Sequence, residues 1–385
     1  MEAWVLLDYP TLRVVWWALL GLLMAAFAVM DGTTLGVAIM LPLVAKNDLE
    51  RRTLLNVIGP VWEGGQVWLI VAGGVIFAAW PLLYAMAFSG FYLAMMLLLI
   101  ALIIRPVAIT YRSKRPEARW RNTWDTLWCV TGFITALVFG VAVGNVMVGV
   151  PFEFDPNNLR PMYQGGFFAL FTPFPLFVGL LSICMMAMQG AACLTWKTDG
   201  AVASRARRAG RWLALATWLL FGLGGLWIAW GIDGYAIVSG VDMSLASNPL
   251  GKAVVLARGG WLDNFLLWPF MQWGPVLGLG GAFLTMVLMM ARRPTRMTWL
   301  FSSLSLIGIV LTFGFALFPF LLPSSLAPNV SLTIWDASAS HFSLWIMLLV
   351  SSILLPIVML YTIWVYRVLR GKVTEQSLKD AHHTY

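Results

Sequence analysis

Residues 12–44 read LRVVWWALLGLLMAAFAVMDGTTLGVAIMLPLV, and this stretch decides the fold class. Its apolar part, from Val14 to Ala45, would be about 48 Å long as a helix, whereas the hydrocarbon core of a bilayer is roughly 30 Å thick. Apolar runs of similar character recur along the 385 residues, of which 60% are hydrophobic and 11% are charged. This composition excludes a soluble protein and predicts an all-α integral membrane protein that crosses the bilayer many times.

The polar breaks between these runs predict nine transmembrane helices packed as a bundle. The whole chain, 1–385, then forms one transmembrane domain with a short polar tail at 367–385. The expected helices span residues 12–44, 54–79, 83–104, 124–148, 165–194, 212–235, 264–291, 297–320 and 340–366.

The basic residues predict the orientation of the bundle. Of 25 Lys and Arg residues, 21 fall in loops on one side, and only Arg13, Arg160, Lys252 and Arg258 fall on the other. Basic loops stay in the cytoplasm, so we expect the N-terminus outside and the tail inside the cell. The formal net charge of +8 is thereby explained without a nucleic-acid partner.

Two acidic residues, Asp31 and Glu63, interrupt predicted spans. Placing an ionised side chain deep in the hydrocarbon core costs about 2.5–3.5 kcal/mol of free energy or more. Each of these two side chains should therefore face protein or water. Arg105, at the cytoplasmic end of the third expected span, is the nearest candidate cation, and antiparallel neighbours could bring the three together. Two interpretations remain open: a proton-accessible cluster, or a polar cluster that only locks helices together.

Several kinds of site are disfavoured by what the sequence contains. The three histidines are His341, His382 and His383, and the last two lie in the polar tail, so a haem held by two histidines inside the bilayer is excluded. Cys129, Cys184 and Cys193 have neither zinc nor disulfide spacing. We find no nucleotide-binding or zinc-hydrolase motif, and we expect neither a metal nor any cofactor bound by this chain alone.

The residues around Asp31, Glu63 and Arg105 resemble subunit II of cytochrome bd-type quinol oxidases, a family that includes cyanide-insensitive members. The resemblance is carried by MDGTTLGV at 30–37, PVWEGGQVWLI at 60–70, RPVAITYRSK at 105–114, GVAVGNVMVGVPF at 140–152, SLTIWDASAS at 331–340 and LLPIVMLYTIWVYRVLRG at 354–371.

The resemblance implies a respiratory enzyme of the bacterial inner membrane that oxidises quinol and reduces oxygen to water, separating charge without a proton pump. Its haem b and haem d groups belong to a homologous subunit I, without which this chain would be inactive. Small single-helix accessory subunits are further expected partners, and some family members hold a structural ubiquinone in subunit II. Asp31, Glu63 and Arg105 would belong to a proton path into subunit I, and Trp68 to an oxygen route.

Two departures from the family pattern affect the expected path. Val61 stands where relatives often have His, and Glu63 stands where Asp is common. An ion-coupled secondary transporter using Asp31 and Glu63 is the alternative function, and a purely structural subunit is a third hypothesis.

Overall fold

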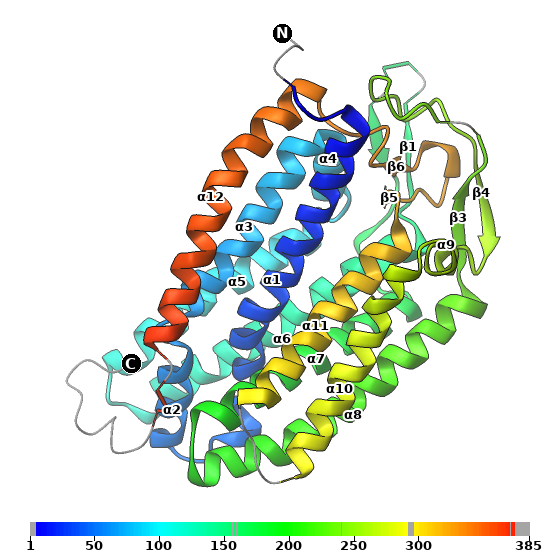
Figure 1. Cartoon of the computed structure of the whole chain (residues 1–385). Helices are drawn as coiled ribbons and strands as arrows, with labels where there is room; N and C mark the ends of the chain where they lie inside the picture. Colours follow the sequence, from blue (N-terminus) through cyan, green and yellow to red (C-terminus); the bar gives the residue numbers. More distant parts are fainter. Residues whose placement is uncertain are drawn as a thin grey trace.

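The computed structural model describes residues 5–155, 157–158, 160–239, 241–291, 296–369 and 371–373. Long helices lie side by side along one direction, and α1 begins at the end of the bundle opposite to the one where α12 ends (Figure 1). The helices are α1 (Tyr9–Val44), α2 (Asp48–Ile58), α3 (Trp62–Ala79), α4 (Pro81–Gly90), α5 (Tyr92–Tyr111), α6 (Ala118–Val148), α7 (Pro173–Lys197), α8 (Gly200–Gly231), α9 (Asp263–Leu267), α10 (Trp273–Met290), α11 (Arg296–Leu317) and α12 (His341–Val368).

In the described part of the chain, nine helical segments are long and apolar enough to cross a membrane. They correspond one for one to the nine expected spans, although several boundaries were wrong. The span expected at 212–235 belongs to α8, which begins twelve residues earlier at Gly200, because Arg205 and its charged neighbours extend the helix as a polar segment. The span expected at 264–291 is interrupted by the η5 turn (Pro269–Gln272), and α10 begins only at Trp273.

The expected span 54–79 is wrong at its beginning. Residues 54–58 belong to α2, a separate amphipathic helix that begins at Asp48, and α3 begins only at Trp62. Pro60 has no backbone N–H to continue the hydrogen-bond ladder, so the chain turns between the two helices. Likewise, the span expected at 83–104 is divided between α4 and α5, which meet at Phe91.

Three loops that lie between helices form small hairpins, which the sequence analysis did not predict. The strands are β1 (Phe152–Phe154) with β2 (Pro161–Tyr163), β3 (Asp233–Ile237) with β4 (Val254–Arg258), and β5 (Phe320–Leu322) with β6 (Leu332–Thr333), all antiparallel. They gather at one end of the bundle in Figure 1, which we call the hairpin end. The opposite end, where α2 and the loops at 45–47 and 112–117 lie, is the basic end.

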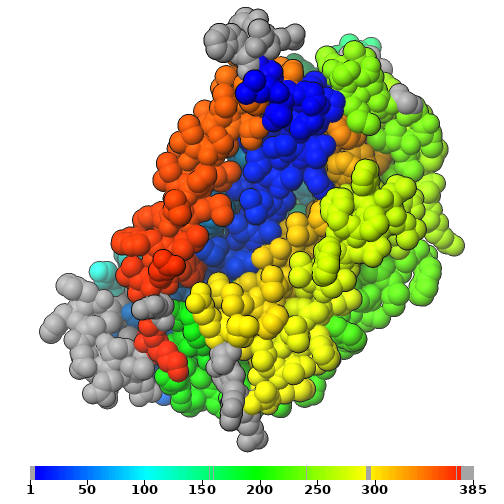
Figure 2. Space-filling model, viewed as in Figure 1, coloured from blue at the N-terminus to red at the C-terminus, as the bar shows by residue number. Residues whose placement is uncertain are grey.

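Glycines bring α1 and α7 into backbone contact at the centre of the bundle. A Cβ atom at Gly36 would lie 1.9 Å from the carbonyl oxygen of Met186, and one at Gly190 would lie 2.2 Å from the carbonyl carbon of Gly36. The helices therefore pack closely in the way that small residues permit within lipid. In contrast, α12 lies on the outside of the bundle beside α1, where Figure 2 shows its surface in orange and red. Its most apolar segment has no buried residue.

Candidate functional site

A buried ion pair joins α1 and α5 near the basic end. The Nη1 of Arg105 donates to the Oδ2 of Asp31 at 2.9 Å, and the two side chains are 1% and 0% exposed. Gly65, in the first turns of α3, packs on the backbone of Asp31, where its Cβ would be 3.1 Å from the Asp31 nitrogen. Asp31 therefore lies level with the first turns of α3.

The pair is extended by Gln66 and is not saturated. The Nη2 of Arg105 donates to the Oε1 of Gln66 at 3.0 Å. The Oδ1 of Asp31 and the Nε of Arg105 are buried and have no hydrogen-bond partner among the described residues. Because a buried polar atom without a partner costs free energy, both atoms are suited to bind a water molecule or, at Asp31, a proton.

Glu63 does not join this pair, so the expected cluster of three ionisable groups is only partly formed. It lies in the first turn of α3, is exposed, and makes no hydrogen bond or ion pair with another described residue. At helical spacing it shares a face with Val67 and Ile70, which are 39% and 66% exposed. Gln66, on the next face of α3, takes the place beside Arg105 that we had expected Glu63 to occupy.

Trp68 lies about one turn after Gly65 on α3, in an apolar cluster. Its side chain is 6% exposed and packs with Leu23 and Phe27 of α1 and with Ala72. The indole Nε1 finds no hydrogen-bond partner in the described ranges. Trp68 therefore lies in the apolar contact between α1 and α3.

A second buried polar group links α1, α7 and α11, and we did not predict it from the sequence. Gln189 is fully buried; its Nε2 donates to the Oγ1 of Thr33 at 3.2 Å and to the Oγ of Ser303 at 2.8 Å. Ser302 donates to the Oε1 of Gln189. The sequence signal for this group is a single uncharged amide within the apolar run MMAMQGAA, 185–192, which the depth of ionisable residues does not reveal.

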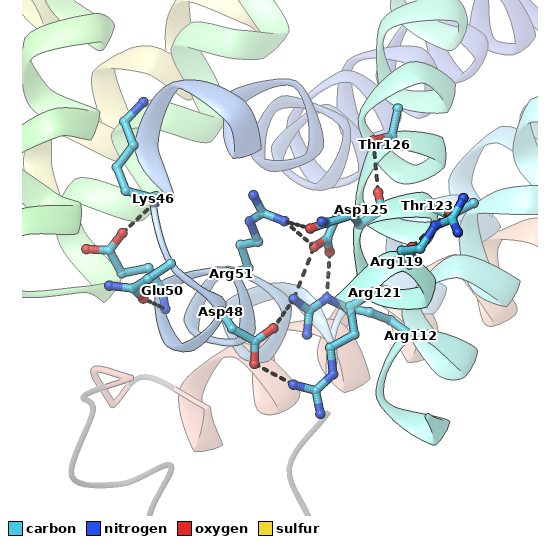
Figure 3. Close-up of polar contacts among 12 residues, drawn as sticks. Lys46, Asp48, Glu50, Arg51, Arg112, Arg119, Arg121, Thr123, Asp125 and Thr126 are labelled. Carbon is cyan, nitrogen blue, oxygen red and sulfur yellow. Dashed lines mark hydrogen bonds and ion pairs between the residues drawn. The ribbon is translucent and has the colours of Figure 1, made fainter. Parts of the chain in front are cut away.

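The basic end is held by a network of ion pairs, shown in Figure 3. Arg112, which is 1% exposed, donates through Nε to the Oδ1 of Asp125 at 2.5 Å and through Nη2 to the Oδ1 of Asp48 at 2.7 Å. Arg51 reaches the other oxygen of Asp125 at 3.0 Å, and Arg121 reaches Asp48 at 2.9 Å. The network ties α2 to the end of α5 and the start of α6, and we assign it a structural role.

Glu50 of α2 is a partly buried carboxylate at the basic end that is held by hydrogen bonds. Burial raises the pKa of its carboxyl group, but hydrogen bonds from the Lys46 backbone N–H and from Arg205 outweigh burial, and the net pKa is lower than 4.5. The stabilisation is therefore present above about pH 4.5 and is lost as the pH falls through the lowered value. We predict that Glu50→Gln lowers the midpoint temperature of unfolding near neutral pH. In this variant the midpoint temperature should also decrease less as the pH is lowered.

The control for this prediction is Glu117→Gln, because Glu117 is exposed at the same end. Thermal unfolding in detergent over a pH series measures both variants. An acid profile of Glu50→Gln that overlays the profile of the parent protein would contradict the prediction.

The described residues contain one histidine, His341, and it is engaged at the hairpin end. Its Nε2 lies 2.8 Å from the carbonyl oxygen of Leu7, and its ring lies 5.2 Å from that of Tyr9. His382 and His383 lie outside the described residues. Among the residues that the structure describes, no group of three or more His, Cys, Asp or Glu side chains could hold a metal ion.

Comparison with known proteins identifies similar sequences over nearly the whole chain. The family model for "Cytochrome bd terminal oxidase subunit II" matches residues 12–369. The cytochrome bd-I ubiquinol oxidase subunit 2 of Escherichia coli K12 is 45% identical over 381 residues, which cover 98% of this chain and 100% of the relative. A probable cytochrome oxidase subunit 2 of Haemophilus influenzae is 40% identical over 99% of this chain and 100% of that protein.

The fold also has a match among solved structures. A chain from the bd oxidase of Geobacillus thermodenitrificans matches with a TM-score of 0.66, covering 92% of this chain and 98% of that chain. The two sequences are 18% identical, so this likeness supports the arrangement of the helices and no individual residue role.

Proposed function

Because the chain belongs to the cytochrome bd terminal oxidase subunit II family, we propose that it is the haem-free subunit that delivers protons, through Asp31, to the oxygen-reducing centre of a quinol oxidase. As a member of this family it is a subunit of an oxidoreductase complex and a multi-pass protein of the bacterial inner membrane. The relatives are numbered as second subunits, which implies a partner subunit I. The haem b and haem d groups of that partner would supply the electron transfer and the oxygen chemistry.

The observation that carries the proposal is the buried Asp31–Arg105 pair with its unpartnered Oδ1 atom. A pair that only fixed two helices would be expected to use both carboxylate oxygens, because unpaired buried atoms lose hydration. At Asp31 one carboxylate oxygen is held by Arg105, and the other has no partner among the described residues, so that it is available to a water molecule or a proton. A carboxyl group held in this way can alternate between the two protonation states.

The proposed orientation gives the path its direction. By the positive-inside rule the basic end faces the cytoplasm, so Asp31 and the start of α3 lie nearer the cytoplasm than the hairpin end does. The exposed stripe of Glu63, Val67 and Ile70 would contact subunit I, because exposing the Glu63 carboxylate to lipid acyl chains would cost free energy. Protons would pass from Asp31 towards Glu63 and the partner without the histidine that relatives often have at Val61.

We predict that Asp31→Asn lowers quinol oxidase turnover of the assembled complex by at least about ten-fold, equivalent to about 1.4 kcal/mol in the rate-limiting barrier. The amide keeps the shape and the hydrogen bond to Arg105, but it carries no exchangeable acid proton at this position. Oxygen consumption by the purified complex measures turnover, and the visible spectrum measures haem content. Loss of haem in parallel with turnover would indicate a folding role instead.

The matched variant Asp31→Glu retains the carboxyl group and should restore a large part of the activity that Asp31→Asn loses. Equal turnover of the Asn variant and the parent complex, with full haem content, would exclude the proton role.

For oxygen we propose the apolar cluster around Trp68 as the route. Enlarging Ala72, which is 1% exposed beside Trp68, to leucine should raise the KM for oxygen several-fold and leave kcat at saturating oxygen unchanged. Gly74→Ala on the same helix is the control, because a Cβ there meets no atom within 4 Å. An unchanged KM in Ala72→Leu would contradict the route.

The remaining partners are proposals of the same kind. Quinol and oxygen would be substrates of the complex, small single-helix subunits would be accessory partners, and a structural ubiquinone in this subunit stays a prediction from the family. The transporter hypothesis gains no support, because the relatives reported above are named as oxidase subunits. A purified complex that binds a solute and lacks haem absorption would favour it.

A further inference from the structure

The first part of α8 carries three arginines on one face of the helix, at the basic end. They are Arg207, Arg208 and Arg211, and at 3.6 residues per turn they fall within about 100° of the helix circumference. A different face of α8 packs on α10, where a Cβ at Gly210 would lie 2.6 Å from the Sδ of Met289. The three side chains, which we call the arginine face, therefore lie on a side of α8 that α10 does not cover.

The arginine face has no counter-ion in the described part of the chain. None of its side chains forms a salt bridge or a hydrogen bond with another described residue, whereas Arg205, two residues earlier, pairs with Glu50. The Nε of Arg211 is buried and has no hydrogen-bond partner among these residues. Arg207 and Arg211 are four residues apart, a spacing at which like charges destabilise a helix. An anion from outside the chain would therefore stabilise this segment.

An exposed apolar stripe continues from the arginine face along α8. Trp212, Leu219 and Leu223 follow Arg208 at intervals of four, seven and four residues, which keeps them on one side of the helix. All three are exposed, Trp212 to 61%. Leu219 lies about 16 Å along the helix from Arg208, which is roughly half of a 30 Å hydrocarbon core. The stripe can therefore lie along the acyl chains of one leaflet.

Trp212 marks the boundary between the charged and the apolar parts. The Cζ of Arg211 lies 5.5 Å from the centre of the Trp212 ring. Tryptophan is typical of the membrane–water interface, and arginine stacks on its ring through a cation–π interaction. Charge, interfacial ring and apolar stripe thus follow one another in the same order as the phosphate, the glycerol and the acyl chains of a phospholipid.

The arginine face lies away from the surface that we assign to subunit I. The α8 helix packs against α7 and α10, whereas α12 packs beside α1 and α3, and Figure 1 shows α8 and α12 on opposite sides of the bundle. The stripe of Glu63, Val67 and Ile70 belongs to α3. A partner that covers α3 therefore leaves the outer side of α8 in contact with lipid.

We propose that the arginine face binds the phosphate of an anionic phospholipid, whose acyl chains lie along the apolar stripe of α8. The positive-inside rule places this end at the cytoplasmic leaflet, where basic clusters beside a membrane span attract anionic lipids. Guanidinium groups present paired N–H donors that match the oxygens of a phosphate. Phosphatidylglycerol has a net negative charge and phosphatidylcholine has none, so the site should distinguish the two lipids. The proposal is independent of the proposed proton path.

Native mass spectrometry of the assembled complex in detergent, titrated with dioleoyl phosphatidylglycerol, measures the affinity. Each basic side chain near an anionic lipid contributes about 1 kcal/mol, so Arg207→Gln/Arg208→Gln/Arg211→Gln should weaken binding about a hundred-fold. The matched control is Lys114→Gln/Arg115→Gln/Arg119→Gln, which removes three charges from exposed residues at the same end and should weaken binding less than about three-fold. Dioleoyl phosphatidylcholine should bind weakly to the parent complex and to both variants.

Three results would overturn the proposal. An equal loss of affinity in the two triple variants would show a diffuse attraction to the whole basic end. Equal affinities of the parent complex for phosphatidylglycerol and phosphatidylcholine would show that the charge of the lipid is not recognised. Displacement of phosphatidylglycerol by an equal concentration of inorganic phosphate would show a phosphate site to which the acyl chains contribute nothing.

Single variants test the site with less risk to the fold. Arg208 is exposed, and Arg208→Gln should weaken binding of phosphatidylglycerol about five-fold, with the haem content and turnover of the parent complex. Trp212→Leu keeps an apolar side chain but loses the contact with Arg211, and should weaken binding about two-fold or more. Arg119→Gln is the control for both and should bind as the parent does. An unchanged affinity in Arg208→Gln would contradict the proposal even if the triple variant did not assemble.

Discussion

Arg105→Met should destabilise the folded subunit by about 3–5 kcal/mol, because it leaves the carboxylate of Asp31 buried without its cation. Asp31 is 0% exposed, and the remaining polar neighbour, Gln66, accepts a hydrogen bond from Arg105 and makes none with Asp31. Methionine fills a similar volume, so the loss should reflect charge and not a void. The yield of assembled complex and its thermal midpoint in detergent provide the measurement.

A double variant separates the charge from the packing. Asp31→Asn/Arg105→Met contains no buried charge at this place and should recover most of the stability that Arg105→Met loses, without recovering turnover. Arg119→Met is the control, since Arg119 is exposed at the start of α6. Similar midpoint temperatures of unfolding for Arg105→Met and Arg119→Met would contradict the expected loss of stability at the buried pair.

Gly36→Ala should have an effect of about 3 kcal/mol or more, at the upper end of the cost of overpacking. The added Cβ would lie 1.9 Å from the carbonyl oxygen of Met186 and 2.7 Å from the backbone nitrogen of Gly190. Both atoms belong to the backbone of α7, so no side chain can turn away, and the two helices must separate. Because α1 carries Asp31 and Thr33, the shift should also lower the haem content of the assembled complex.

Gly21→Ala is the matched control on the same helix, because a Cβ at Gly21 meets nothing within 4 Å. Alanine is better than glycine within a helix by about 1 kcal/mol, so this variant should be neutral or stabilising. Only the alanine at position 36 is therefore expected to destabilise the complex. A stable Gly36→Ala complex would contradict the close contact of α1 and α7.

The helices were predictable because hydropathy integrates over about 20 residues, and a run such as α1 leaves no other structure that satisfies its backbone in lipid. The ends of the helices could not be predicted in this way, because charged residues that favour helix, such as Arg205, extend α8 well beyond its apolar part. The hairpins were missed because each strand has two to five residues, too few for a pattern of alternation.

The site was predicted in part for equally physical reasons. Depth along a helix predicts which ionisable residues are buried, and it identified Asp31 and Arg105, which the structure pairs. It failed for Glu63 because the expected span ran through Pro60, where the chain turns and a new helix begins. Gln66 and Gln189 carry no charge, so the depth of ionisable residues gives no indication of these amides, which extend the buried polar contacts.

The most direct test of the role of Asp31 is infrared difference spectroscopy of the assembled complex as it cycles between its reduced and oxidised states. If this side chain carries protons, a carboxyl C=O band should change intensity during the cycle, shift in deuterated water and vanish in Asp31→Asn. The same band persisting in Asp31→Asn, or no carboxyl band changing at all in the parent complex, would contradict the account.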